Sequence, residues 1–106
     1  MAIKRIWHGW TEPANAGAYQ RLLHDEVIPG IEAKAIPGFS GIELLRRDHD
    51  DEVEFVTIMT FDSIDDVVAF QGEDYDTAYV PVAAQRVLKR WDDTSTHFTV
   101  VEARSY

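Results

Sequence analysis

Cysteine is absent from the chain, and basic residues are few: Lys and Arg number 10, against 19 Asp and Glu in 106 residues. Without cysteine there is no disulfide framework, thiolate metal site or cysteine nucleophile. The formal net charge of -9 argues against nucleic acid and anionic membranes, because both are bound through clustered cations. We therefore expect no nucleic-acid partner and no membrane partner.

Long hydrophobic runs are also absent. No apolar stretch approaches the roughly 20 residues that cross a bilayer, and the N-terminus lacks the hydrophobic region of a signal peptide. The cytoplasm is therefore the expected location. Hydrophobic residues make up 45% of the chain and charged residues 27%, which is typical of a globular protein. This length and composition predict a single domain over residues 1–106.

The spacing of apolar residues predicts strands where they alternate and helices where they recur every three or four residues. Pro37 and Gly38 turn the chain between a helix and a strand, and Gly38 is expected to take a positive φ. Pro29 is expected to kink or interrupt the first helix, and Ser63 to cap the second with Asp66. The expected strands are 2–12, 39–47, 53–61 and 97–103; the expected helices are 16–35 and one starting after 63, followed by a mixed segment at 72–91.

The order β-α-β-β-α-β predicts an α+β, ferredoxin-like protomer with a four-stranded antiparallel sheet and helices on one face. The other sheet face would then be too apolar to meet water over so large a patch. A second copy of the chain is the simplest cover, so we expect a homodimer through this open face, with the two sheets forming a dimeric α+β barrel. The residues expected on the open face are Ile6, His8, Trp10, Val56, Ile58 and Val101.

Three stretches resemble a known family. The segment Ile36-Pro37-Gly38-Phe39, running into Gly41-Ile42-Glu43-Leu44, is similar to the antibiotic-biosynthesis monooxygenase (ABM) family of dimeric α+β barrels. So are Phe61-Asp62-Ser63-Ile64-Asp65-Asp66 and the opening Ile6-Trp7-His8-Gly9-Trp10. The resemblance implies a pocket inside each protomer, between helices and sheet. It also implies an enzyme that oxidises anthrones or quinols with O2 and uses no metal, flavin or other cofactor.

Another branch of that family degrades heme with an asparagine, a tryptophan and a histidine. Alignment through the shared turns places these three on Trp7, Phe61 and Tyr79, and none of them matches. Heme degradation is therefore not expected. The four histidines also lack H-x-H, H-x3-H or H-E-x-x-H spacing, so no metal site is expected.

The same alignment suggests an aromatic pocket for a small aromatic or quinol-like molecule. Arg5 would stabilise an enolate or phenolate, because a fixed cation is worth more in a dry site than in water. Tyr79 would orient a carbonyl, and Trp7 would shape the cavity or relay an electron. The expected substrate-binding residues are Met59, Phe61 and Phe98 on the helix-facing side of the sheet, and His24 at the pocket mouth.

Structural interpretations of the same residues stay open at this point. Aromatic residues at strand spacing also suit a solid core, and His24 also suits a solvated helix edge. Arg5 also suits an ion pair with Glu102, and His8 and His97 suit hydrogen-bonded positions on the dimer face. The alternative to an enzyme is therefore a non-catalytic module of the same fold that binds a small ligand or dimerises.

Overall fold

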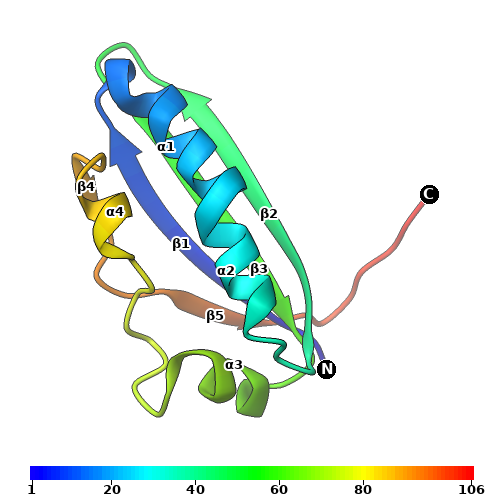
Figure 1. Ribbon diagram of the computed structural model, residues 1–106. Coiled ribbons are helices and arrows are strands. Elements are labelled where there is room, and N and C mark those ends of the chain that lie inside the picture. The colour runs from blue at the N-terminus through cyan, green and yellow to red at the C-terminus, as the bar shows by residue number, and fades with distance from the viewer.

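The computed structural model describes residues 1–106 and places helices against one face of an antiparallel sheet (Figure 1). This confirms the predicted α+β, ferredoxin-like protomer. None of the helices is long and apolar enough to span a membrane. The elements are β1 (Ile3–Thr11), a 3-10 turn (Pro13–Asn15), α1 (Ala16–Leu22), a π-helical turn (Leu23–Val27), α2 (Ile28–Ala33), β2 (Phe39–Asp48), β3 (Val53–Phe61), α3 (Ile64–Gln71), α4 (Val82–Gln85), β4 (Arg90–Trp91) and β5 (Thr96–Thr99).

The sheet has five strands, in the order β2-β3-β1-β4, with β5 also paired to β1. β4 pairs with the end of β1 at Gly9 and Trp10, and β5 pairs with its start, from Ile3 to Ile6. The place expected for one fourth strand is therefore shared by two short ones. The chain leaves the ladder between them, where the carbonyl of Asp92 accepts a hydrogen bond from the Trp7 indole instead.

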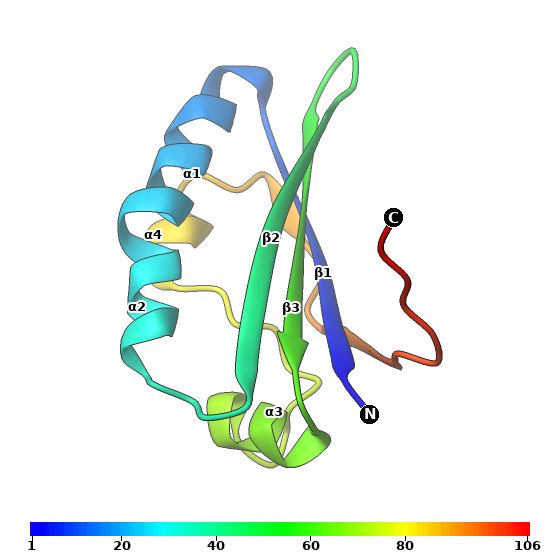
Figure 2. The same ribbon diagram turned by 90° about the vertical axis from the view of Figure 1, so that its right-hand side faces the viewer.

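The two faces of the sheet differ in what covers them. Along β1, odd-numbered residues are buried and even-numbered residues are half-buried, as strand alternation requires. Figure 2 shows α1, α2 and α4 on one side of the sheet, α3 at the end of the sheet, and the C-terminal segment on the other side. The predicted open-face positions are confirmed except Val101, which lies beyond β5 and is 88% exposed. The confirmed ones are Ile6, His8, Trp10, Val56 and Ile58.

The first helix accommodates Pro29 by widening before it. The predicted interruption is confirmed, but it takes the form of the π-helical turn Leu23–Val27, and the helix then continues to Ala33. A proline cannot donate to the carbonyl four residues back and its ring crowds that carbonyl. A π-turn adds one residue to the turn and relieves both problems.

The turn between α2 and β2 uses its glycine differently from the prediction. The positive φ falls on Ala35, at 51°, and not on Gly38. Gly38 is needed for space: a Cβ there would lie 1.8 Å from Oδ2 of Asp66 at the start of α3. That carboxylate accepts a hydrogen bond of 3.0 Å from Ser63 Oγ. Ser63 is the N-cap of α3 as predicted, but the expected capping box is wrong, because the two side chains bond to each other and not to the backbone N–H groups of the helix start. Gly38 therefore lets the turn pack against the start of α3.

Replacing Gly38 with alanine should destabilise the protein by about 1–3 kcal/mol, because the new methyl group displaces Asp66 from Ser63. Urea unfolding measures the effect. Gly41→Ala is the matched control, since nothing lies within 4 Å of a Cβ at Gly41. The loss should shrink in an Asp66→Ala background. An equal loss in both backgrounds would contradict the contact as its cause.

Candidate functional site

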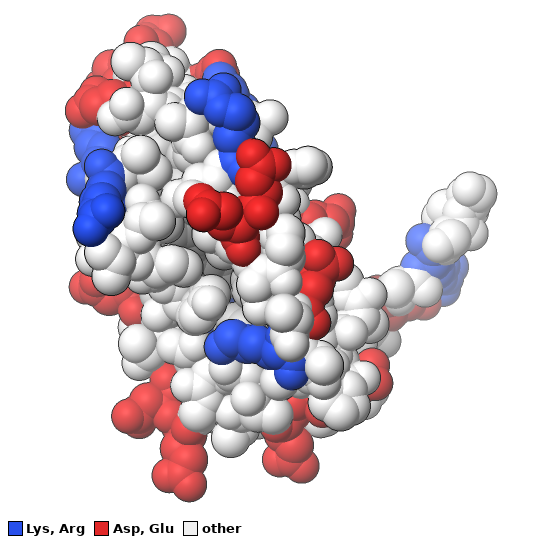
Figure 3. Space-filling model, viewed as in Figure 1, with Lys and Arg blue, Asp and Glu red and all other residues white.

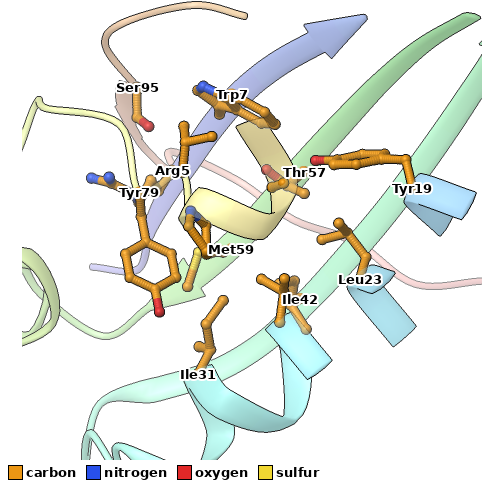
Figure 4. A pocket seen from close by; sticks show the side chains of 14 residues that line it. Arg5, Trp7, Tyr19, Leu23, Ile31, Ile42, Thr57, Met59, Tyr79 and Ser95 are labelled. Carbon is orange, nitrogen blue, oxygen red and sulfur yellow. The ribbon is translucent and has the colours of Figure 1, made fainter. Parts of the chain in front are cut away.

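A cavity lies between the sheet and the layer formed by α1, α2 and α4 (Figure 4). Its volume is about 40 Å³. Ten of the fourteen lining residues are hydrophobic. The lining consists of Arg5, Trp7, Tyr19, Leu23, Val27, Ile31, Ile42, Thr57, Met59, Tyr79, Val80, Pro81, Ala84 and Ser95.

The size of this cavity limits what it holds without movement. Its volume of about 40 Å³ is far below the roughly 300–1,000 Å³ of a typical pocket for a small ligand. An aromatic ligand therefore requires the wall to shift. The wall from Tyr79 to Pro81 is half-buried and lies outside regular helix and strand, between α3 and α4. This is the part of the lining with the fewest backbone constraints.

Arg5 is the cation of the cavity. It occupies an inward position on β1 and is only 3% exposed. Its guanidinium donates to the carbonyl of Tyr75, to the carbonyl of Thr77 at 2.9 Å and to Nε2 of His97 at 2.9 Å. It also lies 5.5 Å from the centre of the Phe70 ring. These contacts hold the guanidinium in place between β1 and the segment after α3.

Arg5 keeps its charge without a direct acidic partner. Burial lowers its pKa to about 10, an effect that the charge of Asp76 partly offsets. The group is therefore protonated at neutral pH. The alternative ion pair with Glu102 is wrong, because Glu102 pairs with Arg104. The cavity wall thus carries a positively charged guanidinium whose hydrogen-bond partners are all uncharged.

His97 holds the far side of Arg5. It pairs in register with Arg5, so it lies on the helix-facing side of β5 and not on the expected dimer face. Its side chain is 8% exposed, and its Nδ1 is 3.2 Å from Oδ1 of Asp76, without the alignment of a hydrogen bond. Since Nε2 accepts a hydrogen bond from Arg5, the ring proton belongs on Nδ1. Burial, helped by the charge of Arg5, lowers the pKa of His97, while Asp76 opposes the shift.

This lowered pKa predicts a pH-dependent stability. The unfolded chain binds a proton at His97 more readily than the folded one, so the stabilisation is complete above about pH 6.5 and is lost as the pH falls below it. His97→Gln, which cannot titrate, should show a smaller loss of stability between pH 7.5 and 5.5 in urea unfolding. His24→Gln is the control, because His24 is solvent-exposed. Equal pH dependence in His97→Gln and the parent would contradict the prediction.

Trp7 forms a fixed wall of the cavity. Its side chain is buried at 7% exposure, and Nε1 donates to the carbonyl of Asp92 at 2.7 Å. The ring lies across Gly9, where a Cβ would come within 2.6 Å of the indole. Trp7 therefore shapes the cavity, and both the hydrogen bond and the glycine restrict its rotation.

Tyr79 and Met59 also line the cavity, as predicted. Tyr79 is half-buried and packs edge-on against Phe70, with ring centres 5.2 Å apart. The ammonium of Lys34 lies 4.8 Å from the Tyr79 ring and 4.9 Å from the Phe70 ring. Figure 4 shows the Tyr79 ring directed toward Ile31 of α2. Arg5, Trp7, Met59 and Tyr79 are thus brought together around one space.

Three other predicted residues lie elsewhere. Phe61 is fully buried, but it packs between Phe39 and Phe70 in the core and does not line the cavity. Phe98 pairs with Lys4, is 53% exposed and lies on the open face, so its predicted placement was wrong by one residue of strand register. The side chain of His24 is 86% exposed, pairs with Asp25 and borders a separate open hollow.

The prediction missed three hydroxyl groups of the lining. Tyr19 belongs to the apolar face of α1 and packs edge-on against Phe55, and burial raises the pKa of its hydroxyl. Thr57 is an inward residue of β3, and Ser95 precedes β5. Tyr19 and Thr57 could have been found from the sequence, because each is a residue with a hydroxyl group on the apolar face of its helix or strand. No periodic signal marks Ser95. No group of three or more His, Cys, Asp or Glu residues is placed to hold a metal ion.

Comparisons with known proteins find likeness in structure. No family model matches the chain, and no curated protein matches it in sequence. The structure of Rv0793 from Mycobacterium tuberculosis superposes with a TM-score of 0.65 at 16% identity, covering 99% of this chain and 100% of that one. A candidate antibiotic biosynthesis monooxygenase from Bacillus cereus also gives 0.65, at 10% identity, covering 100% and 97%.

A third structure is that of SnoaB, described as a cofactor-independent oxygenase from Streptomyces nogalater. It superposes with a TM-score of 0.55 at 19% identity, covering 96% of this chain and 95% of that one. These identities are too low to carry function from one protein to another. The chain therefore has the fold of solved structures described as antibiotic biosynthesis monooxygenases, as the resemblance in its turns and caps predicts.

Proposed function

We propose that this protein is a cofactor-independent monooxygenase that acts on a small aromatic or quinol-like molecule in the cavity beside Arg5. The observation that carries the proposal is a buried, charged guanidinium in the wall of a largely apolar cavity. The likeness of the fold to SnoaB, a cofactor-independent oxygenase, supports it. In this proposal Arg5 is a catalytic residue, Tyr79 orients a carbonyl of the substrate, and Trp7 and Met59 form the walls.

The chemistry needs the substrate as an anion, which gives one electron to O2. Recombination of the resulting radical with superoxide forms a C–O bond, and the peroxide anion takes up a proton from solvent, equivalent to the one that the substrate lost on ionising. Loss of water then leaves a carbonyl: one oxygen atom of O2 enters the product, and the other departs as water with both hydrogens of the oxidised CH2 carbon. Arg5 would lower the energy of the anion, because a preorganised cation acts strongly where water is excluded.

Oxygen uptake tests this function directly. The protein would be incubated with a panel of anthrones and quinols in an oxygen electrode, and products would be analysed after reaction in 18O2. One labelled oxygen atom in the product supports the proposal. Ligand-induced thermal shifts without oxygen consumption across the panel would instead favour the second candidate, a non-catalytic binding module.

We also propose a homodimer through the open sheet face. Support comes from the apolar side chains on that face, where Leu45 is 44% and Phe98 53% exposed beside Ile6 and Ile58. The C-terminal segment adds to this, because it follows β5 without a strand partner of its own (Figure 2). An apolar patch of this kind is typical of an interface with another chain.

Light scattering after gel filtration should therefore give twice the chain mass at micromolar concentration. Ile58→Glu should convert the protein to a monomer, because it places a charge in the centre of the proposed interface. Val82→Glu is the matched control: Val82 is 63% exposed on α4, on the opposite side of the sheet. A monomeric parent protein would contradict the proposed dimer.

A further inference from the structure

The positive charge inside this protein contrasts with its acidic exterior. Figure 3 shows many acidic groups on the visible face, including a cluster around α3, and few basic ones. Arg5 and Lys34 nevertheless meet at the same aromatic ring, since both lie within 5.5 Å of the centre of Phe70. Neither makes an ion pair. Arg5 therefore lines the cavity, Lys34 lies beside its Tyr79 wall, and neither cation is in direct contact with an acidic group.

The hydrogen-bond partners of Arg5 carry no negative charge. Two are backbone carbonyls and the third is the Nε2 atom of His97, all of them uncharged. Asp76, the nearest acid to act on Arg5, stands behind His97 with its side chain 71% exposed. A buried cation is most favourable beside a negative partner. A ligand oxygen with a full negative charge would supply that partner from the cavity side.

The lining also has no group suited to remove a proton from a ligand. Its polar side chains besides Arg5 are the hydroxyls of Tyr19, Thr57, Tyr79 and Ser95. His97 is the nearest candidate base, but its free nitrogen already accepts a hydrogen bond from Arg5. A general base must reach the proton that it removes.

From this we infer that the cavity selects ligands that are already anions at neutral pH: acidic phenols, hydroxyquinones and enols of cyclic 1,3-dicarbonyl compounds. The inference rests on the proposed function in using the same cavity, and it narrows the substrate class. Arg5 pairs with the anionic oxygen, and Lys34 stands beside Tyr79, where the wall has to move. Weakly acidic phenols and neutral aromatics bind less tightly.

A pair of probes of equal size tests this on the intact protein. The probes are 4-nitrophenol, which ionises near neutrality, and 4-nitroaniline, which stays neutral. Calorimetry at pH 8 should show 4-nitrophenolate binding at least about 10-fold more tightly than 4-nitroaniline, as expected for a hydrogen bond to a charged group. Lowering the pH to 6 should weaken binding of 4-nitrophenol and leave that of 4-nitroaniline unchanged.

A variant that leaves the core intact provides the second arm. Lys34 is exposed, and Lys34→Met should weaken phenolate binding about two- to fivefold without altering 4-nitroaniline binding. Arg86→Met, also exposed, is the matched control and should alter neither. Equal affinity of the two probes, or no binding of either, would overturn the inference. Oxygen uptake is measured separately, so phenolate selectivity without turnover would refute the proposed function and leave the inference intact.

Discussion

Arg5→Met is expected to lower kcat/KM for a turned-over substrate by about 10²–10³-fold, the usual cost of removing a group that stabilises a developing oxyanion. Arg5 is the charged group in the lining, and methionine keeps its apolar stem while removing the guanidinium. The effect should appear in KM as well as in kcat, because Arg5 pairs with the substrate anion in the bound complex, before the anion gives its electron to O2. Steady-state oxygen consumption over a range of substrate concentrations measures both parameters.

The controls separate chemistry from folding. Arg5→Met also removes the donor to the partly buried carbonyls of Tyr75 and Thr77, so a stability loss is expected as well. Arg5→Lys keeps the charge but not the three-partner fork, and it should recover part of the activity. Circular dichroism and urea unfolding establish that each variant is folded. Unchanged turnover in folded Arg5→Met would exclude Arg5 as the catalytic cation.

Phe61→Ala is expected to destabilise the protein by about 3–5 kcal/mol, which is the usual cost of deleting a buried aromatic side chain. Phe61 is fully buried at the end of β3. Its ring centre lies 5.5 Å from that of Phe39 and 5.8 Å from that of Phe70. Because small domains have only about 5–15 kcal/mol of stability, this single change removes a large share of it. Urea unfolding gives the difference.

A milder pair of substitutions distinguishes core from substrate wall. Phe61→Leu should reduce stability and leave KM unchanged, because Phe61 does not line the cavity. Met59→Leu, two residues earlier on the same strand, conserves volume and should cost less than about 1.5 kcal/mol. It should nevertheless alter KM, because Met59 lines the cavity. An altered KM in Phe61→Leu together with an unchanged KM in Met59→Leu would indicate that Phe61, and not Met59, contacts the substrate.

Much of the fold follows from local patterns. The alternation at 2–12 and 53–61 and the turn at Pro37 and Gly38 predict elements that the structure confirms to within a few residues. The alternation also separates the two faces of β1, and the family resemblance assigned the face with Arg5 and Trp7 to the helices, as the structure shows. Side-chain period and chain stiffness are local properties, so a single sequence carries them.

The C-terminal strand shows where local pattern fails. In the C-terminal stretch, bulky residues occur at both odd and even positions, so the alternation fits either register. The prediction chose the register that places Phe98 on the helix-facing side of the sheet. In the structure β5 has the other register on β1, in which His97 lies opposite Arg5. That choice depends on a contact between residues 92 positions apart in the sequence. A one-residue slip exchanges every side chain between the faces.

By itself, the sequence determined the α+β order, the turn before β2, the split of β1 into two faces and the inward placement of Arg5, Trp7 and Met59. Tertiary structure alone decided that Tyr19, Thr57 and Ser95 join the cavity, that Phe61 fills the core beside Phe39 and Phe70, and that His97 holds the guanidinium of Arg5. The reason is physical: periodicity fixes which way a side chain points from its own backbone, whereas a cavity and its charge balance depend on which distant side chains fill the opposite wall.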